Sequence, residues 1–573
     1  MKNIKNFTKS VKILCGALAA ATVLGGCSSA SQTQTAAEPT PTQAPTVETQ
    51  ENTQDYVPTS GGELYLTIPN TTNLDPYTTV NNDMREFLNL IYDRPINVEA
   101  DGSFSAGLIE SWQVDESKTV FTFNVRQGVT FHDGTALTAQ TLVSCMDRVL
   151  GYTRNVPAQT AQDDTQGEED SEDATNTEGE DTGAPEDSND APVVNSNPNR
   201  YTKYNDYVSS YSATDEYTIE LTMNKAGNSG LYFMTFPVMT AAGNGTGAYV
   251  YDSSTDEGIY LKANENWWKK SPYIKSVFGK FITNEDEKIS LYQQSIADMV
   301  ITDSQSISKI WSSSNTTVTD YLTNYYDCIV PSLYNGSLKD ENVRKAISYA
   351  IDRREIISTV LLNHAEAAEM PISPDFYAYD VKYKLYEHDV DMAKSILREA
   401  GYKTSEEEEG QQITLRMIVP YEIGDEYRVD VAQNIANQLS EIGIDCQIEK
   451  LGAAEYRQKL INVDFDLAYC SYYLDQDPDV SFMLKTDASA NYGHVANSEL
   501  DAILDACAAS CDTDEVKANY ANLQQYFLDK VPQIGLFFKM DCLVSENSVK
   551  GINSNVYEEY VYSGISAWSI ENK

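Results

Sequence analysis

The segments ITLRMIVP (residues 413–420), VDVAQNIANQLSEIGI (429–444) and DCQIEKL (445–451) follow one another along this chain of 573 residues. The first and last are short apolar runs typical of buried strands, and the middle one has apolar residues at helical spacing. A helix between two apolar strands is the connection that a parallel pair of strands requires. The stretch therefore predicts a parallel α/β layer, and we expect an α/β fold.

The rest of the chain shows the same alternation of helical and extended patterns. The length is sufficient for two or three structural units. Thr138 is a plausible N-cap, Gly401 a plausible helix end, and Asp133-Gly134 a typical turn. Further helices are predicted at residues 137–150, 284–299, 342–361 and 389–402, and strands at 63–68, 119–125, 217–223 and 532–544.

The composition is strongly acidic. The chain has 41 Lys and Arg against 86 Asp and Glu, a formal net charge of −45. Such a surface repels phosphate backbones, so nucleic acid is excluded as a partner. Residues 155–200 form a low-complexity acidic insert with no helix or strand pattern, and we expect a disordered, solvated loop there. Tyrosine, with 38 copies, suits a cleft that must offer both apolar faces and hydroxyl groups.

The N-terminus has the pattern of an export signal. Four lysines precede an apolar run at residues 13–24, which is too short to span a membrane as a helix. The following Leu24-Gly25-Gly26-Cys27 resembles the bacterial lipobox, which implies cleavage before Cys27 and acylation of its sulfur (diacylglyceryl and palmitate). The alternative is an ordinary signal peptide. We therefore predict a lipoprotein signal peptide at 1–26, a flexible tether at 27–60, and a location at the extracytoplasmic face of the cell membrane.

Cysteines and histidines show no metal-binding spacing. Seven cysteines remain after residues 15 and 27 are set aside, with no CxxC motif and no nearby histidine, so buried free thiols are expected. The four histidines are scattered, at positions 132, 364, 388 and 494. Motifs of serine hydrolases and zinc proteases are absent from the sequence. We expect no metal, no cofactor and no enzymatic activity.

Several short motifs occur in a fixed order along the chain. They are LDP (74–76), GLIESW (107–112), FHDGTALTA (131–139), GTGAY (245–249), VRKAI (343–347) with AIDR (350–353), AKSILREAGY (393–402) and DPD (477–479). Together and in this order they resemble one known family, the extracellular solute-binding proteins of peptide/nickel-type ABC importers (bacterial family 5). The resemblance implies a two-lobed periplasmic-binding-protein-like fold (type II, large peptide-binding class) with a hinged cleft. The larger lobe would hold residues 61–279 and 534–573, and the smaller lobe residues 280–533.

The resemblance also implies a function. The chain would be a monomeric substrate-binding lipoprotein that captures peptides outside the cell and delivers them to ABC permease subunits. Two alternatives stay open, namely a binding protein for another solute such as an oligosaccharide, and a surface receptor that does not transport.

The expected ligand site departs from the family pattern. Peptide-binding members carry an Asp three residues before the DP element, where it pairs with the ammonium group of the peptide. Counting back from Asp477 places Leu474 at that position, and Asp475 lies one residue off. A local bulge could return the Asp475 carboxylate to the cleft. We therefore expect Asp475, with Tyr472 and Tyr473 as aromatic lining, to bind the ligand.

The lipobox generates a first prediction. Cys27→Ala removes the sulfur that would be acylated, so the variant should be released from membranes or stay unprocessed. Membrane fractionation with mass spectrometry of the N-terminal peptide measures this. A Cys27→Ala protein that remains acylated in the membrane fraction would contradict the assignment.

Overall fold

The computed structural model describes residues 57–151, 200–303, 306–310, 315–334, 336–383, 386–423, 426–553 and 556–571. The predicted signal peptide, Cys27 and nearly all of the tether lie outside these ranges. The same holds for the predicted acidic insert, apart from its last residue. The statements on these segments stay predictions.

The β-α-β unit predicted from the sequence is confirmed. It consists of β14 (Ile413–Pro420), α9 (Tyr427–Glu441) and β15 (Ile444–Leu451). The two strands pair in parallel, from Ile413 opposite Ile444 to Pro420 opposite Leu451. The predicted helix end at residue 444 is wrong by three residues. Gly443 adopts a positive φ of 82°, which ends the helix and lets Ile444 enter the strand.

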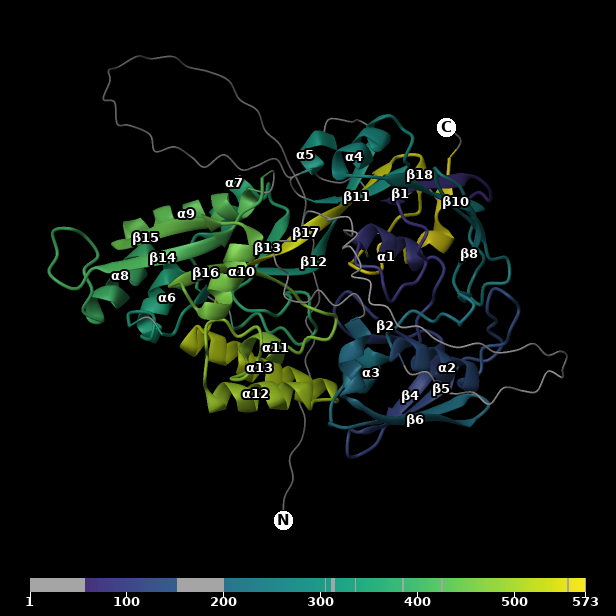
Figure 1. Cartoon of the computed structure of the whole chain (residues 1–573), viewed down its shortest axis with the longest axis horizontal. Helices are drawn as coiled ribbons and strands as arrows, with labels where there is room; N and C mark the ends of the chain where they lie inside the picture. Colours follow the sequence, from purple (N-terminus) through teal and green to yellow (C-terminus); the bar gives the residue numbers. More distant parts are fainter. Residues whose placement is uncertain are drawn as a thin grey trace, which may run out of the picture. The chain divides into compact units, whose positions relative to one another are not determined.

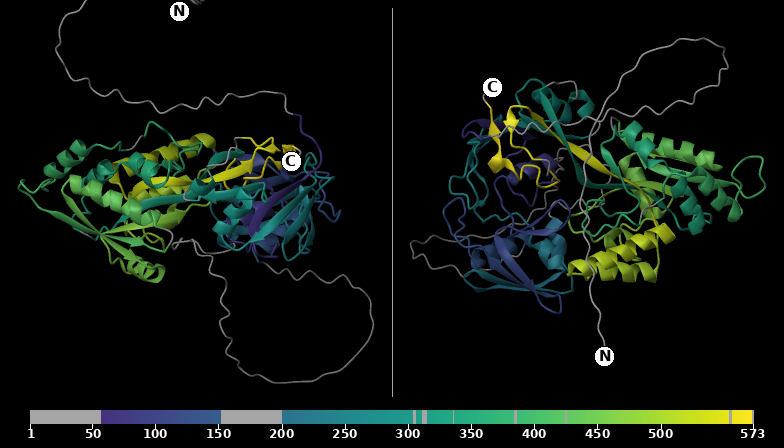
Figure 2. Two further views of the ribbon diagram at one scale, coloured as in Figure 1. Left: turned by 90° about the horizontal axis from the view of Figure 1, so that it is seen from above. Right: turned by 180° about the vertical axis from the view of Figure 1, so that it is seen from behind.

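A large mixed sheet carries this unit and two unusually long strands. Its order is β11-β17-β12-β16-β14-β15, and β13 pairs with β17. Figures 1 and 2 show β17 in yellow running diagonally beside the teal β12. These two strands pair antiparallel from Thr316 opposite Glu546 to Ile329 opposite Ile534, with a register shift between Leu322 and Tyr326. The bounds are β11 (Met299–Asp303), β12 (Thr316–Pro331), β13 (Ala365–Ala367), β16 (Leu467–Tyr473) and β17 (Ile534–Glu546).

The N-terminal half forms two four-stranded sheets, β1-β10-β9-β8 and β4-β5-β7-β6, and a hairpin, β2-β3. Its helices include α2, which begins after Thr138. The predicted N-cap is confirmed, because Thr138 accepts a hydrogen bond from the Thr141 amide. The bounds are β1 (Glu63–Pro69), α1 (Asn82–Leu88), β2 (Ile96–Val98), β3 (Phe104–Ala106), β4 (Ile109–Val114), β5 (Val120–Val125), α2 (Ala139–Val149), the 3-10 helix η1 (Arg200–Asn205), β6 (Val208–Asp215), β7 (Thr218–Met223), α3 (Ser229–Phe233), β8 (Tyr249–Ser254), β9 (Gly258–Ala263) and β10 (Ser276–Ile282).

Two predicted helices are shorter in the structure. The single helix expected at 342–361 is in fact α6 (Glu341–Ala350) and α7 (Arg353–Val360). Asp352 breaks it, because its side chain accepts the Glu355 amide and so starts a new helix. The helix expected at 284–299 ends early, as α4 (Glu285–Gln293), before Ser295 at a positive φ of 54°. The other helices are α5 (Ile307–Ile310), α8 (Val390–Glu399), α10 (Ala453–Asn462), α11 (Ser481–Leu484), α12 (Ser498–Ala508), α13 (Thr513–Lys530) and the 3-10 helix η2 (Ile565–Ala567).

The apolar cores divide along the chain. One core joins the N-terminal sheets to C-terminal residues that include Leu543, Tyr562 and Trp568. Two others lie on the large mixed sheet and use β17 residues such as Phe537 and Phe538. The two strands β18 (Val549–Lys550) and β19 (Ser569–Ile570) pair near the end of the chain. The lobe boundaries at residues 280 and 533 stay predictions.

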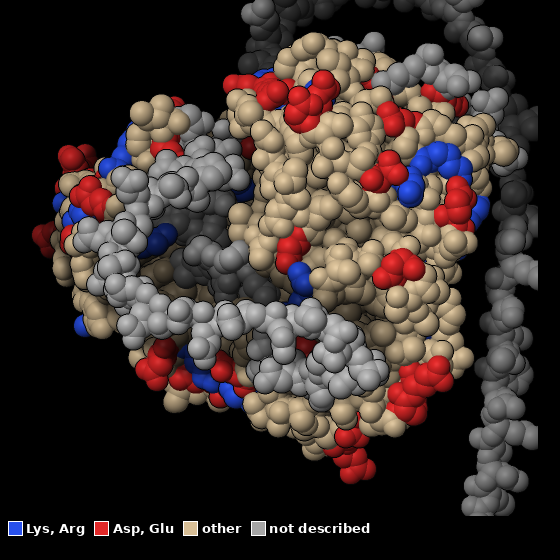
Figure 3. Space-filling model, turned by 45° about the vertical axis from the view of Figure 1, so that its right-hand side comes forward, with Lys and Arg blue, Asp and Glu red and all other residues tan. Residues whose placement is uncertain are grey.

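Acidic side chains are exposed on the surface of the protein. On the face drawn in Figure 3, red carboxylate side chains are scattered rather than gathered in one patch. No helix in the described part of the chain combines the length and apolar character needed to cross a membrane.

The close packing of β17 generates a second prediction. A Cβ on Gly535 would collide with the Tyr326 hydroxyl and the backbone of Ala368 and Glu369. Gly535→Ala should therefore lower the free energy of unfolding by about 1–3 kcal/mol. Gly336→Ala is the matched control, because a Cβ at that position would meet no atom within 4 Å. Urea denaturation of both variants measures the difference, and equal midpoints would contradict the packing.

Candidate ligand-binding site

The turn after β16 holds the three predicted aspartates. Asp475 accepts a hydrogen bond from the Gln476 amide at 2.8 Å, and Asp479 accepts one from the Ser481 amide at 2.9 Å. Asp477 accepts one from the Asp479 amide at 3.2 Å. These bonds show that the three aspartates cap their own turn.

Asp475 also pairs with a cation from the N-terminal half of the chain. Lys203, in η1, places its Nζ 3.0 Å from Asp475 Oδ2 and 3.7 Å from Asp477 Oδ2. Burial lowers the pKa of Lys203, but Asp475, Tyr204 and Asp477 raise it by more, so the pKa lies well above its usual value. Burial raises the pKa of the Asp477 carboxyl, and Lys203 opposes that rise. A protonated lysine thus sits where a ligand ammonium was expected to pair with Asp475.

Two cavities meet at this ion pair. Each has a volume of about 500 Å³ or slightly less, and both are lined by Leu474 and Asp475. The first, the lysine-side cavity, contains Lys203 and Lys485. It also contains the carboxylates of Asp475, Asp477, Asp479, Asp487 and Asp501.

The second cavity, called here the acidic cavity, is lined only by acidic charged groups. No Lys, Arg or His occurs among the described residues that line it. Aromatic and apolar walls come from Tyr321, Phe376, Phe538 and Tyr557. Its carboxyl-bearing residues are Glu99, Asp320, Glu366, Asp375, Asp475 and Glu558.

Burial shifts several of these carboxyl groups toward the protonated form. The pKa of Glu558 is raised to about 8, first by burial and then by Glu559, while Arg85 opposes the shift. Burial raises the pKa of Asp375, and burial together with Asp375 raises that of Glu366. A positively charged ligand would reverse these shifts, because a nearby cation favours the ionised carboxylate.

The two predicted tyrosines occupy other places. Tyr472 is 1% exposed, packs edge-on against Phe482 and donates its hydroxyl to the Ala490 carbonyl at 3.3 Å. Tyr473 is half-buried and donates its hydroxyl to Glu559 at 3.2 Å. Neither lines the lysine-side cavity or the acidic cavity. Their assignment to the ligand site stays a prediction without a contact to support it.

Other predicted features fall outside these cavities. His132 bonds the Gly247 carbonyl through Nε2 at 3.1 Å, next to a turn in which Asp133 accepts the Thr135 amide. The seven cysteines at residues 145–542 are free thiols, five of them buried. Sequence reasoning missed Lys203, which follows the acidic insert without a local motif. It also missed Phe376, Phe538 and Glu558, which only the fold brings together.

The fold and the paired cavities define a binding protein for a solute. The family model for bacterial extracellular solute-binding proteins, family 5 (middle part), matches residues 103–494, and the chain belongs to this family.

Relatives within the family have different ligands in their names. The chain is 25% identical over 308 residues to the oligopeptide-binding protein AppA of Bacillus subtilis, covering 51% of this chain and 56% of that protein. It is 22% identical over 510 residues to heme-binding protein A of Haemophilus influenzae, covering 83% and 86%. The structure of HbpA2 from Haemophilus parasuis matches with a TM-score of 0.71 at 16% identity, covering 89% of this chain and all of that one. This likeness confirms the predicted fold.

The Lys203–Asp475 pair generates a third prediction. Lys203→Met and Asp475→Asn should each lower the free energy of unfolding. The double variant should lower it by less than the sum of the two single effects. Because Lys203 is 35% exposed, we expect a coupling of only roughly 0.5–1 kcal/mol. The control is the exposed Lys262–Asp252 pair, for which the same cycle should give a smaller value. Urea unfolding of all variants measures both cycles, and a coupling of zero at Lys203 would exclude a maintained pair.

Proposed function

We propose that this protein is the lipid-anchored substrate-binding subunit of an ABC importer, and that it captures peptides outside the cell for a permease. The acidic cavity is the observation that carries the ligand assignment. Its carboxyl groups attract cations, and its aromatic walls can cover apolar side chains. We therefore assign to it peptides with free amino groups or basic side chains.

Capture needs binding and closure rather than catalysis. The proposed hinge is formed by β12 and β17, whose register shift between Leu322 and Tyr326 marks a point where the ladder is interrupted. A ligand that contacts both sides of the cavity favours the closed form over the open one. Contacts that already join the halves of the chain include the ion pairs of Lys203 with Asp475 and of Lys118 with Glu515, the latter at 2.6 Å.

Lys203 sets the ligand chemistry near Asp475. Its ammonium already neutralises this carboxylate, so a peptide amine gains little from the same oxygen atoms. Glu366 and Asp375 are two exposed carboxyl groups of the acidic cavity, and neither has an ion pair among the residues that the structure describes. We therefore place the positive charge of the ligand beside these two residues, away from the position that the family pattern suggests.

This placement generates a fourth prediction. The full chain should bind trilysine more tightly than triglutamate, and the preference should weaken with added salt because it is electrostatic. Glu366→Gln and Asp375→Asn should each weaken trilysine binding by roughly 0.2–1 kcal/mol, up to about fivefold, as expected for exposed charge pairs.

Calorimetric titration measures these affinities. Asp286→Asn is the control, because Asp286 is 82% exposed and pairs with Lys309 outside the cavity. If wild type and both cavity variants bind trilysine with the same affinity, the assigned position is contradicted. The absence of binding by any peptide tested would contradict the proposed ligand class.

A further inference from the structure

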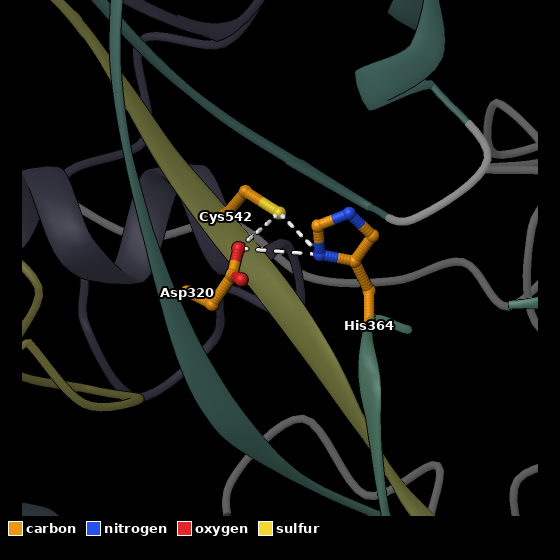
Figure 4. Close-up of side chains that lie close together, drawn as sticks. All are labelled: Asp320, His364 and Cys542. Carbon is orange, nitrogen blue, oxygen red and sulfur yellow. Dashed lines mark hydrogen bonds and ion pairs between the residues drawn. The ribbon is translucent and has the colours of Figure 1, made fainter. Parts of the chain in front are cut away.

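Three side chains with metal-binding donor atoms meet beside the acidic cavity. Asp320, His364 and Cys542 converge in Figure 4, and their donor atoms all lie within 4.8 Å of one another. Cys542 Sγ is 3.1 Å from Asp320 Oδ1 and 3.5 Å from His364 Nδ1. His364 Nδ1 is 3.2 Å from Asp320 Oδ1. We call these residues the Asp-His-Cys cluster.

Neighbouring strands of one sheet hold the cluster. Asp320 on β12 lies directly opposite Cys542 on β17, so both side chains leave the sheet on the same face. His364 immediately precedes β13, and its carbonyl accepts the Met540 amide of β17 at 3.0 Å. Donors on paired strands keep their separation better than donors on loops. The sheet therefore holds Asp320 and Cys542 in place, and the hydrogen bond from Met540 holds the backbone of His364 beside them.

The separations fit a tetrahedral ion. Zinc lies about 2.3 Å from sulfur and about 2.0–2.1 Å from nitrogen or oxygen, so neighbouring donors of a tetrahedron are roughly 3.3–3.6 Å apart. The three distances in the cluster, 3.1, 3.2 and 3.5 Å, are within a few tenths of an ångström of these values. One thiolate, one imidazole and one carboxylate also form a donor set that suits zinc.

We propose that Asp320, His364 and Cys542 form a binding site for a divalent metal ion of borderline softness, with Zn²⁺ as the best match. The ion forms a bond to each donor atom, and the Cys542 thiol loses its proton to solvent when the sulfur–metal bond forms. Three protein ligands leave a fourth position for water or for a donor group of a solute.

The exposure of the three residues gives the ion a way in. His364 is 6% exposed and Cys542 is fully buried, whereas Asp320 is 42% exposed and lines the acidic cavity. An ion therefore reaches the cluster from the cavity past Asp320. The carboxyl groups of the cavity raise the local concentration of cations at this entrance.

The cluster lacks any sequence motif, because its members lie at positions 320, 364 and 542. Hydrogen bonds alone also account for short distances between a carboxylate, a thiol and an imidazole. The two explanations differ in one respect, since only a metal site binds an added ion through sulfur. Metal binding by the peptide-free protein separates them and is independent of the proposed function.

The test uses the full chain after treatment with a chelator. Titration with Co²⁺ should produce the thiolate-to-cobalt charge-transfer absorption and the visible bands of a tetrahedral ion, and Zn²⁺ should abolish them. Equilibrium dialysis with elemental analysis should give one Zn²⁺ per chain. Cys542→Ser, His364→Gln and Asp320→Asn should each weaken Zn²⁺ binding by at least about 100-fold. Loss of a residue that only hydrogen-bonds to a metal ligand already costs up to about 100-fold, and these residues are the ligands themselves.

Control variants keep the test decisive. Cys446→Ser and His388→Gln remove a thiol and an imidazole elsewhere and should leave Zn²⁺ affinity unchanged. If Cys542→Ser fails to fold, Asp320→Asn at the exposed position still tests the site, since Zn²⁺ should raise the melting temperature of wild type but not of this variant. A wild-type protein without the cobalt–thiolate absorption, or Zn²⁺ binding unaffected by Asp320→Asn, would overturn the proposal.

Discussion

The antiparallel ladder between β12 and β17 is the interaction on which most of the structure depends. It joins Thr316–Pro331 to Ile534–Glu546, two segments separated by more than 200 residues of sequence. One end of β17 contributes Phe537 and Phe538 to the cores of the large sheet, and the other contributes Leu543 to the N-terminal core. A slip of one residue would reverse every side chain on both faces. The cavity wall and the Asp-His-Cys cluster both require this register.

The candidate ligand site differs from the rest of this acidic chain, because a lysine lies among its carboxylates. A protein with a net charge of −45 has an excess of carboxylates, so a cavity lined by them is less surprising than the ammonium group of Lys203 beside it. Lys203 pairs with both Asp475 and Asp477 at the junction of the two cavities, and its single positive charge balances one of the two carboxylates. In the proposed function, the charge that a ligand meets is that of the carboxyl groups not paired with Lys203, among them Glu366 and Asp375.

Local patterns predicted much of the fold and little of the site. The parallel unit at residues 413–451 follows from period and turn chemistry alone, as does the Thr138 cap. The break at Asp352 was missed because amphipathic periodicity continues through it. The burial of Tyr472 does not follow from its pattern, because β16 is buried along most of its length and alternation does not show which face is open. The fold brings Lys203, Phe538 and the Asp-His-Cys cluster to their partners from positions far apart in the sequence. A short stretch of sequence therefore cannot predict these contacts.

The position of the last residues in the N-terminal core has a consequence for biosynthesis. Tyr562 and Trp568 belong to the same core as strands β1 to β10, the last of which ends at Ile282, 280 residues before Tyr562. That core lacks part of its apolar packing until Tyr562 and Trp568 have been synthesised. Contacts of such high sequence separation also slow folding. A nascent chain of this kind is suited to being held extended until this late segment emerges, as happens when a polypeptide is threaded through a membrane before it folds.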